Sequence, residues 1–306
     1  MQQFLLRRLI RAVIVLWGIT TVVFVVMRLS GDPVTLMLPQ DARPEDIERV
    51  RQQLGLDKSL LEQYQIFMTN VLHLDFGQSI NFRQSAFAVA WERVPATLEL
   101  AGAAFLWAVV VAIPIGVLAA MKPYSWLDNS LMMVALVGMS APTFFVGIML
   151  ILIFSLGANI FPTGGRDQGL LSLVLPAITL GAYAMAAIAR LTRSAMLEII
   201  RTDYIRTARA KGLTESLVVY RHALKNAAIP VVTIMGIQLG MLLGGAVVTE
   251  TVFSWPGIGR LAIQSIYNRD YNIVQSTVFM TACWFVVINL AVDIIYGWLD
   301  PRIRYS

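Results

Sequence analysis

The chain has 306 residues, a formal net charge of +5 and a mean hydropathy of +0.68; 57% of its side chains are hydrophobic and only 14% are charged. Soluble domains carry about 25% charged residues, so this composition excludes an ordinary soluble protein and predicts an integral membrane protein. The 24 Lys and Arg residues are dispersed between apolar runs. This dispersal argues against a nucleic-acid binder, whose basic residues gather on one polar face.

Residues that commonly bind metals are scarce. The single cysteine, Cys283, cannot form an intrachain disulfide. Together with only two histidines, it does not supply the four ligands of a structural zinc site. We therefore expect neither a metal nor another cofactor.

Six apolar stretches are long enough to cross a bilayer, which requires roughly 20 helical residues. The first follows three arginines and resembles a secretory signal, but no small-x-small cleavage site comes after it, so we expect an uncleaved helix. The fourth contains Pro176, which membrane helices tolerate near an end. The stretches cover about residues 9–28, 97–121, 130–156, 173–191, 229–252 and 276–298.

The distribution of Lys and Arg predicts the orientation. Six spans place both termini on one side of the membrane, and cytoplasmic loops carry the excess of basic residues. With the N-terminus inside, the inner segments are strongly basic, whereas acidic residues slightly outnumber basic ones outside. Both termini are therefore expected in the cytoplasm.

The segment 30–95 after the first span is expected outside and helical. Pro44 begins a helix favourably, and Ser59 with Glu62 forms the pattern of a capping box, which opens a second helix through Leu72. Two interpretations remain open: a passive cap of amphipathic helices, or a docking site for an outer partner. The expected divisions are 1–29 (tip and first span), 30–95 (outer segment) and 96–306 (five-span core).

The inner loop at 192–228 contains the most distinctive motif, RTARAKGL at 206–213. Ile199, Ile200, Tyr204, Ile205 and Ala208 are spaced to form the apolar side of one helix. The next glycine, Gly212, is expected to end it, because glycine readily adopts the left-handed conformation. Physical reasoning leaves two interpretations: a compact knob that projects into the cytoplasm, or a basic loop lying on anionic headgroups.

The fifth span carries Gly236, Gly240 and Gly244 at four-residue spacing. Small residues at this spacing allow the backbone of another helix to approach closely. The partner is either another helix of this chain or a helix of a second subunit.

Three acidic residues fall within or near the spans, where charge is costly. Glu99 and Glu250 lie near predicted outer ends, which favours interfacial positions. Asp293 lies further inside, and either an ion pair with a basic residue or a water-filled cavity would accommodate it.

Taken together, the motifs resemble ABC-transporter permeases of the dipeptide/oligopeptide/nickel import class. The resemblance covers nearly the whole chain, and the order and spacing of its motifs make it specific. One departure is Arg206, where the broader superfamily often has an acidic residue. The motifs are SGDPV at 30–34, LGLD at 54–57, DFGQSI at 75–80, RVPATLEL at 93–100, SAPTFFVG at 140–147, LPAITLG at 175–181, DYIRTARAKGL at 203–213, RHALKNAAIPV at 221–231, ETVFSWPGIGRL at 250–261, RDY at 269–271 and DPRIRY at 300–305.

This resemblance implies an all-α membrane protein with six transmembrane helices, an extracytoplasmic helical insertion after the first, and a cytoplasmic coupling-helix loop between the fourth and fifth. The coupling helix would seat in an ATPase subunit. The residues assigned to that contact are Tyr204, Arg206, Thr207, Ala208, Arg209, Ala210, Lys211 and Gly212. Candidates for the translocation path or the permease interface are Gly236, Gly240, Gly244, Glu250 and Asp293.

The implied function is that of a permease subunit in the bacterial inner membrane, carrying short peptides; nickel chelates or glutathione are the alternative cargoes. Its expected partners are a homologous second permease, two ATP-binding subunits, an extracytoplasmic binding protein and the lipid bilayer, with no nucleic acid. The pattern G-x-x-x-x-G-K-[ST] does not occur in the sequence, so ATP is expected to be hydrolysed by other chains.

Two other classes fit less well. An intramembrane enzyme needs converging ionisable groups, but His73 and His222 are predicted on opposite sides of the membrane. A self-contained channel or ion-coupled carrier would leave the basic cytoplasmic loop unexplained, and the inverted repeats typical of carriers are not evident.

Overall fold

The structure is a computed structural model that describes residues 2–29, 43–53 and 57–299. Within these ranges the chain is helical, apart from loops and one isolated antiparallel bridge between Gln78 and Ser85. This confirms the all-α prediction. The motifs at 30–34 and 300–305, and most of LGLD at 54–57, lie outside the described residues.

The chain divides into two compact units. Unit 1 comprises Met1–Pro95 and Gly257–Val286, and unit 2 comprises Ala96–Pro256 and Val287–Ser306. The helices of unit 1 are α1 (Gln2–Leu29), α3 (Pro44–Gln53), α4 (Leu60–Leu72), α5 (Ala86–Trp91), α13 (Ile258–Tyr267) and the first part of α14 (Tyr271–Leu299).

The part of unit 1 that follows α1 contains the two predicted helices. α3 begins at Pro44, and α4 follows the Ser59 capping box: the Ser59 main-chain N–H donates to Glu62 Oε2 (3.1 Å) and Glu62 N–H donates to Ser59 Oγ (3.4 Å). α4 packs on α1, where Tyr64 contacts the Phe24 ring edge-on at 5.3 Å and shares a 2.8 Å hydrogen bond with Thr21. These contacts hold α4 to the C-terminal half of α1.

Asp270 joins the DFGQSI loop to the start of α14. Its buried carboxylate accepts hydrogen bonds from Ser79 Oγ at 2.5 Å, from the main-chain N–H of Asn81 at 3.2 Å and from that of Ile273 at 3.3 Å. Next to it, the Asn272 amide donates to the Gln78 carbonyl at 2.7 Å. Two motifs about 190 residues apart in sequence are thus one structural element.

Replacing Asp270 by alanine is expected to destabilise unit 1 by about 3 kcal/mol, because each hydrogen bond to a charged group contributes about 1.5–3 kcal/mol and the buried donors of Ser79 and Ile273 would lose their acceptor. Thermal melting of the purified protein in detergent measures the effect. Asp75→Ala is the matched control, because exposed Asp75 accepts a local bond from Gly77 N–H in the same loop. Equal melting shifts for the two variants would contradict the assignment.

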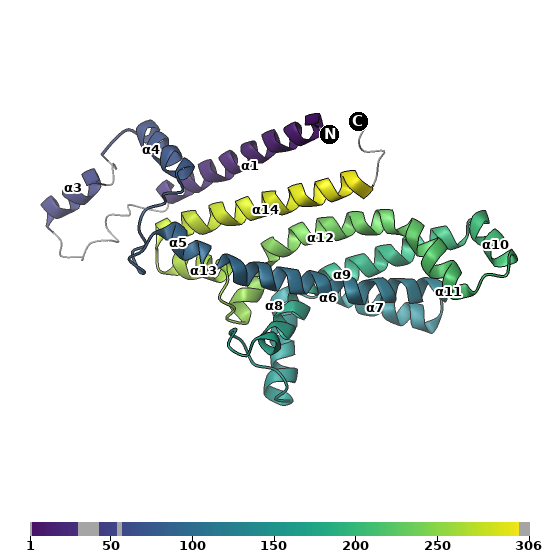
Figure 1. Ribbon diagram of the computed structural model, residues 1–306. Coiled ribbons are helices and arrows are strands. Elements are labelled where there is room, and N and C mark those ends of the chain that lie inside the picture. Colours follow the sequence, from purple (N-terminus) through teal and green to yellow (C-terminus); the bar gives the residue numbers. More distant parts are fainter. Residues whose placement is uncertain (1, 30–42, 54–56, 300–306) are drawn as a thin grey trace. The chain divides into compact units, whose positions relative to one another are not determined.

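Unit 2 is built on three long helices that run side by side, α6 (Val94–Met121), α9 (Leu170–Ile200) and α12 (Leu224–Val252) (Figure 1). α9 is continuous through Pro176, as tolerated in the fourth predicted span. The remaining elements of unit 2 are α7 (Trp126–Ser140), α8 (Thr143–Leu150), the π-helix η1 (Ile151–Gly157), α10 (Asp203–Ala210), α11 (Glu215–Leu217), the π-helix η2 (Val218–Ala223) and the last part of α14.

Five helical stretches among the described residues are long and apolar enough to cross a membrane, and a sixth span arises if one bent pair is counted. That pair corresponds to the third predicted span, 130–156, which is not one continuous helix. The chain breaks after Ser140, and the following helix is inclined by 110°. Ala141 is extended (ψ 131°) because the ring of Pro142 disfavours helical backbone in the preceding residue.

Glycines bring α6 and α9 into backbone contact. A Cβ atom at Gly116 would lie 2.5 Å from Thr192 Cβ and 2.7 Å from the Ala189 carbonyl oxygen. At the other end of the pair, a Cβ atom at Gly181 would lie 2.6 Å from the Ala104 carbonyl oxygen. The rest of this interface is rich in buried alanine, so α6 and α9 form the closely packed centre of unit 2.

Candidate coupling surface

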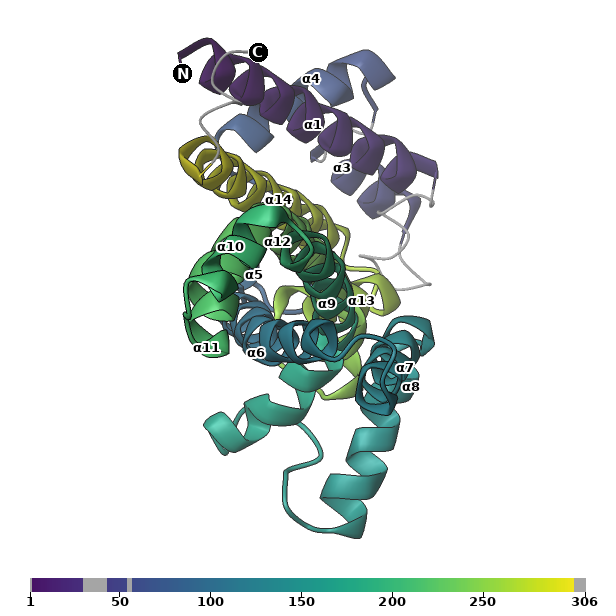
Figure 2. The ribbon, with the colours of Figure 1, turned by 90° about the vertical axis from the view of Figure 1, so that its right-hand side faces the viewer.

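The cytoplasmic knob predicted from sequence consists of α10, α11 and η2, at one end of α9 and α12 (Figures 1 and 2). The prediction that Ile199 and Ile200 share one helix with Tyr204 is wrong. α9 ends at Ile200, and Thr202 is extended (ψ 156°) before α10 begins at Asp203. An acidic residue in the first turn favours a new helix start, because it complements the helix dipole.

One side of α10 is buried. Ile205 is completely buried and Ala208 nearly so, both within the core cluster that includes Val218 and Val219 of η2. Tyr204, which sequence spacing placed on this apolar side, is instead 43% exposed. With only 8 residues, α10 would be marginal as an isolated helix in water, so this packing is what keeps it folded.

Gly212 ends the knob's first helix as predicted. Its φ of +78° is left-handed, its N–H donates to the Arg209 carbonyl (2.9 Å), and the N–H of Leu213 donates to the Ala208 carbonyl (3.4 Å). These two bonds are those of a Schellman motif. A Cβ atom at Gly212 would meet nothing within 4 Å, so only the backbone conformation favours glycine here.

The outer side of α10 is basic and exposed. Arg206, Thr207, Arg209, Ala210, Lys211 and Gly212 are all solvent-exposed. Arg209 forms a bidentate ion pair with Glu215, with hydrogen bonds of 2.6 and 3.1 Å. This hydrogen bonding raises the pKa of Arg209 above its ordinary value. The side chain of Lys211 makes no hydrogen bond or ion pair within the described part of the chain. Of the site's cations, Lys211 is therefore well placed to meet a partner.

A cavity of about 200 Å³ lies beside α10. Its walls come from the end of α6, the α6–α7 hairpin, the end of α9, and the Arg209–Glu215 pair. It is lined by Ala120, Met121, Pro123, Leu197, Ile200, Arg201, Arg209 and Glu215.

The three glycines of the fifth span, Gly236, Gly240 and Gly244, do not share one surface that is free for another helix. A Cβ atom at Gly240 would lie 3.3 Å from Asn289 Oδ1 on α14, so this glycine serves packing within the chain. Gly236 is buried, whereas Gly244 is exposed and a Cβ atom there would meet nothing within 4 Å. Among these three, Gly244 is the candidate left for contact with another subunit.

The acidic candidates differ in their surroundings. The interfacial expectation for Glu250 is wrong: its side chain is fully buried and accepts a 2.6 Å hydrogen bond from Thr97 Oγ1. This hydrogen bond joins α12, which carries Glu250, to α6, which carries Thr97. Glu99 is partly exposed and pairs with Arg166, which fits an interfacial position. Asp293 is half-buried on α14.

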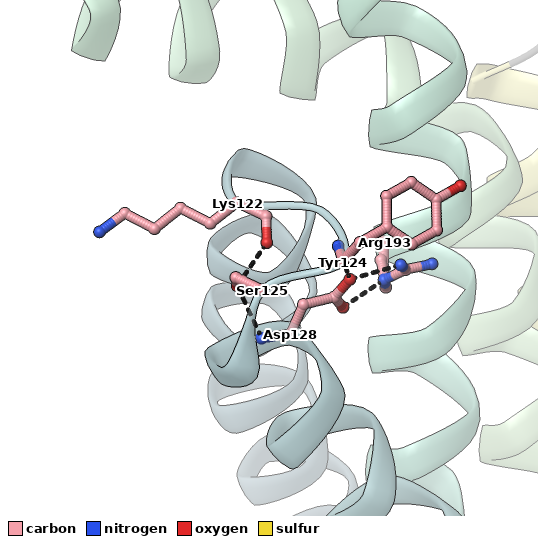
Figure 3. Close-up of polar contacts among 5 residues, drawn as sticks. All are labelled: Lys122, Tyr124, Ser125, Asp128 and Arg193. Carbon is pink, nitrogen blue, oxygen red and sulfur yellow. Dashed lines mark hydrogen bonds and ion pairs between the residues drawn. The ribbon is translucent and has the colours of Figure 1, made fainter.

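Sequence reasoning missed a buried ion pair of unit 2. Asp128 Oδ1 accepts from Arg193 Nε and Asp128 Oδ2 from an Arg193 terminal nitrogen, both at 2.5 Å (Figure 3). The two residues are 65 positions apart, so no local pattern in the sequence pairs them. The signal in the sequence was Ser125, a residue type that commonly caps a helix N-terminus. It indicates that a helix begins next to it, in the turn that contains Asp128.

Comparison with known families and structures places these features in context. Residues 112–305 match the family model of the binding-protein-dependent transport system inner membrane component, and residues 1–101 match that of its N-terminal part. The dipeptide transport system permease DppB of Escherichia coli K12 is 41% identical, and that of Alkalihalophilus pseudofirmus 39%. The glutathione transport system permease GsiC of Escherichia coli K12 is 40% identical; each of these alignments covers 100% of both chains.

Among solved structures, a chain of the MetNI methionine ABC transporter in an inward-facing conformation superimposes with a TM-score of 0.59. The sequence identity is 21%, and the alignment covers 69% of this chain and 96% of the other. At this identity the likeness describes the fold.

Proposed function

Because the chain belongs to the family of inner-membrane components of binding-protein-dependent transport systems, we propose that it forms half of the translocation path of an ATP-binding-cassette importer for short peptides. The observation that carries the proposal is the full-length identity of 41% to a dipeptide permease. In this proposal the chain itself acts as a transport component, and ATP is hydrolysed by other subunits.

The proposed assembly contains a homologous second permease, two ATP-binding subunits that hydrolyse ATP, and an extracytoplasmic protein that delivers the cargo. Both termini and the knob would face the cytoplasm. The exposed residues of α10 and of its C-terminal cap, from Tyr204 to Gly212, would seat in an ATP-binding subunit, while Ile205 and Ala208 connect α10 to the spans. Closure of the ATP-binding subunits would then move α10 together with the helices attached to it. Such a rigid-body movement takes the helices from one packing arrangement to another.

Glutathione is the second candidate cargo, because a glutathione permease is 40% identical over the full length. Uptake of a labelled dipeptide in cells with and without this chain, repeated after ATP depletion, tests the main proposal. Uptake that requires both the chain and ATP supports a peptide importer. If dipeptide uptake is indifferent to the chain but labelled glutathione uptake depends on it, the cargo assignment changes to glutathione.

Reversing the charge of Lys211 (Lys211→Glu) is expected to weaken retention of the ATP-binding subunit about tenfold, the equivalent of 1.4 kcal/mol. The surface of that subunit would be complementary to a basic side chain and would meet a carboxylate instead. The measurement is the fraction of that subunit that co-purifies with the permease. Lys225→Glu, an equal charge change at an exposed site on α12, is the control. Undiminished co-purification of Lys211→Glu would favour a knob that lies on lipid headgroups.

A further inference from the structure

The Asp128–Arg193 ion pair is buried and bidentate. The Asp128 side chain is 1% exposed and that of Arg193 20%. The Asp128 carboxylate also accepts the Tyr124 main-chain N–H at 2.8 Å, while Ser125 Oγ accepts Asp128 N–H at 3.2 Å (Figure 3). One carboxylate thus fixes the α6–α7 hairpin (122–125), the start of α7 and α9 together.

The pair occupies the part of α9 nearest to the proposed coupling helix. Arg193 lies about two turns before the end of α9 at Ile200. Only Arg201 and Thr202 separate α9 from α10. A displacement of α10 would reach the last turns of α9 through this short link and through η2, which contacts both helices, and Asp128 is the point at which it would pass to α7.

The other described contacts between α7 and α9 are less directional. Gly138 faces the Ala182 carbonyl and the Ala186 methyl, small groups along which helices can slide. Arg190 donates to the sulfur of Met139, a weak acceptor. A two-bond Arg–carboxylate pair, by contrast, sets both distance and orientation.

Stability alone does not account for such a pair, because replacing a buried ion pair by well-packed apolar residues is often neutral or stabilising. We propose that Asp128 and Arg193 are positioning residues that make α7, its hairpin and α9 move as one body when α10 is pushed, so that losing the pair uncouples ATP hydrolysis from transport. This inference rests on the proposed importer function.

The test uses the complete transporter in proteoliposomes and measures ATP hydrolysed per peptide imported. Asp128→Asn keeps the shape of the side chain but removes its charge, and the ratio is expected to rise at least about fivefold, the lower end of typical coupling between sites. Arg193→Lys, which keeps the charge but loses the two-pronged geometry, is expected to give an intermediate rise. Glu99→Gln breaks a solvent-accessible carboxylate–arginine pair of the same unit and is expected to leave the ratio unchanged.

If Asp128→Asn lowers hydrolysis and import in equal proportion, the pair is structural only and the proposal is wrong. A second measurement is independent of the cargo: the distance between spin labels at Met133 on α7 and Tyr183 on α9, both exposed. It is expected to be the same in the nucleotide-free and ATP-bound wild type but to change with ATP in Asp128→Asn. An unchanged distance in the variant would also overturn the proposal, whereas failure of peptide import by the wild type would overturn only the cargo.

Discussion

Replacing Ile205 by aspartate is expected to abolish peptide uptake while the membrane-spanning helices still insert. Ile205 lies on the inner face of α10 and is fully buried. An unpaired carboxylate there would cost several kcal/mol, more than so short a helix can offset by itself. α10 would detach from η2, and pushing on it would no longer move α9. The measurements are ATP-dependent uptake and the amount of protein in the membrane.

Ile205→Val is the matched control, because it removes one methyl group and costs about 0.5–1.5 kcal/mol in a typical core. Its uptake is expected to remain close to that of the wild type. Uptake by Ile205→Asp at more than about half the wild-type rate would show that α10 does not depend on its buried face, and the mechanical role proposed for it would then be rejected.

Replacing Gly116 by valine is expected to remove most folded protein from the membrane. The new Cβ would lie 2.7 Å from the Ala189 carbonyl oxygen, which belongs to a helix backbone and cannot rotate away as a side chain can. α6 and α9 would have to separate, at a cost of about 3 kcal/mol or more. Size-exclusion chromatography of the solubilised protein measures the folded fraction.

Gly102→Val on the same helix controls for the loss of a glycine and the gain of a β-branched side chain. Gly102 is exposed, and a Cβ atom there would meet nothing within 4 Å. Its folded fraction is expected to match the wild type. If Gly116→Val accumulates as well as Gly102→Val, the close contact between α6 and α9 is not required for folding.

Several features followed from the sequence because their causes are local. The capping box at Ser59 and Glu62, the helix start at Pro44 and the left-handed Gly212 each depend on residues within one turn of chain. The spans followed from their apolar length, because a bilayer imposes one requirement on any sequence. The break at Pro142 also had a local cause, but a continuous apolar run concealed it.

The sequence by itself therefore determined the class of protein, the number of apolar stretches and the basic helix that ends at Gly212. Only the tertiary structure decided which charged side chains are buried and which residues they bond to: Glu250 bonds to Thr97, Asp270 to Ser79, and Asp128 to Arg193. The physical reason is distance along the chain. These partners are between 65 and 191 residues apart, and no local pattern encodes which helices will bring two such side chains together.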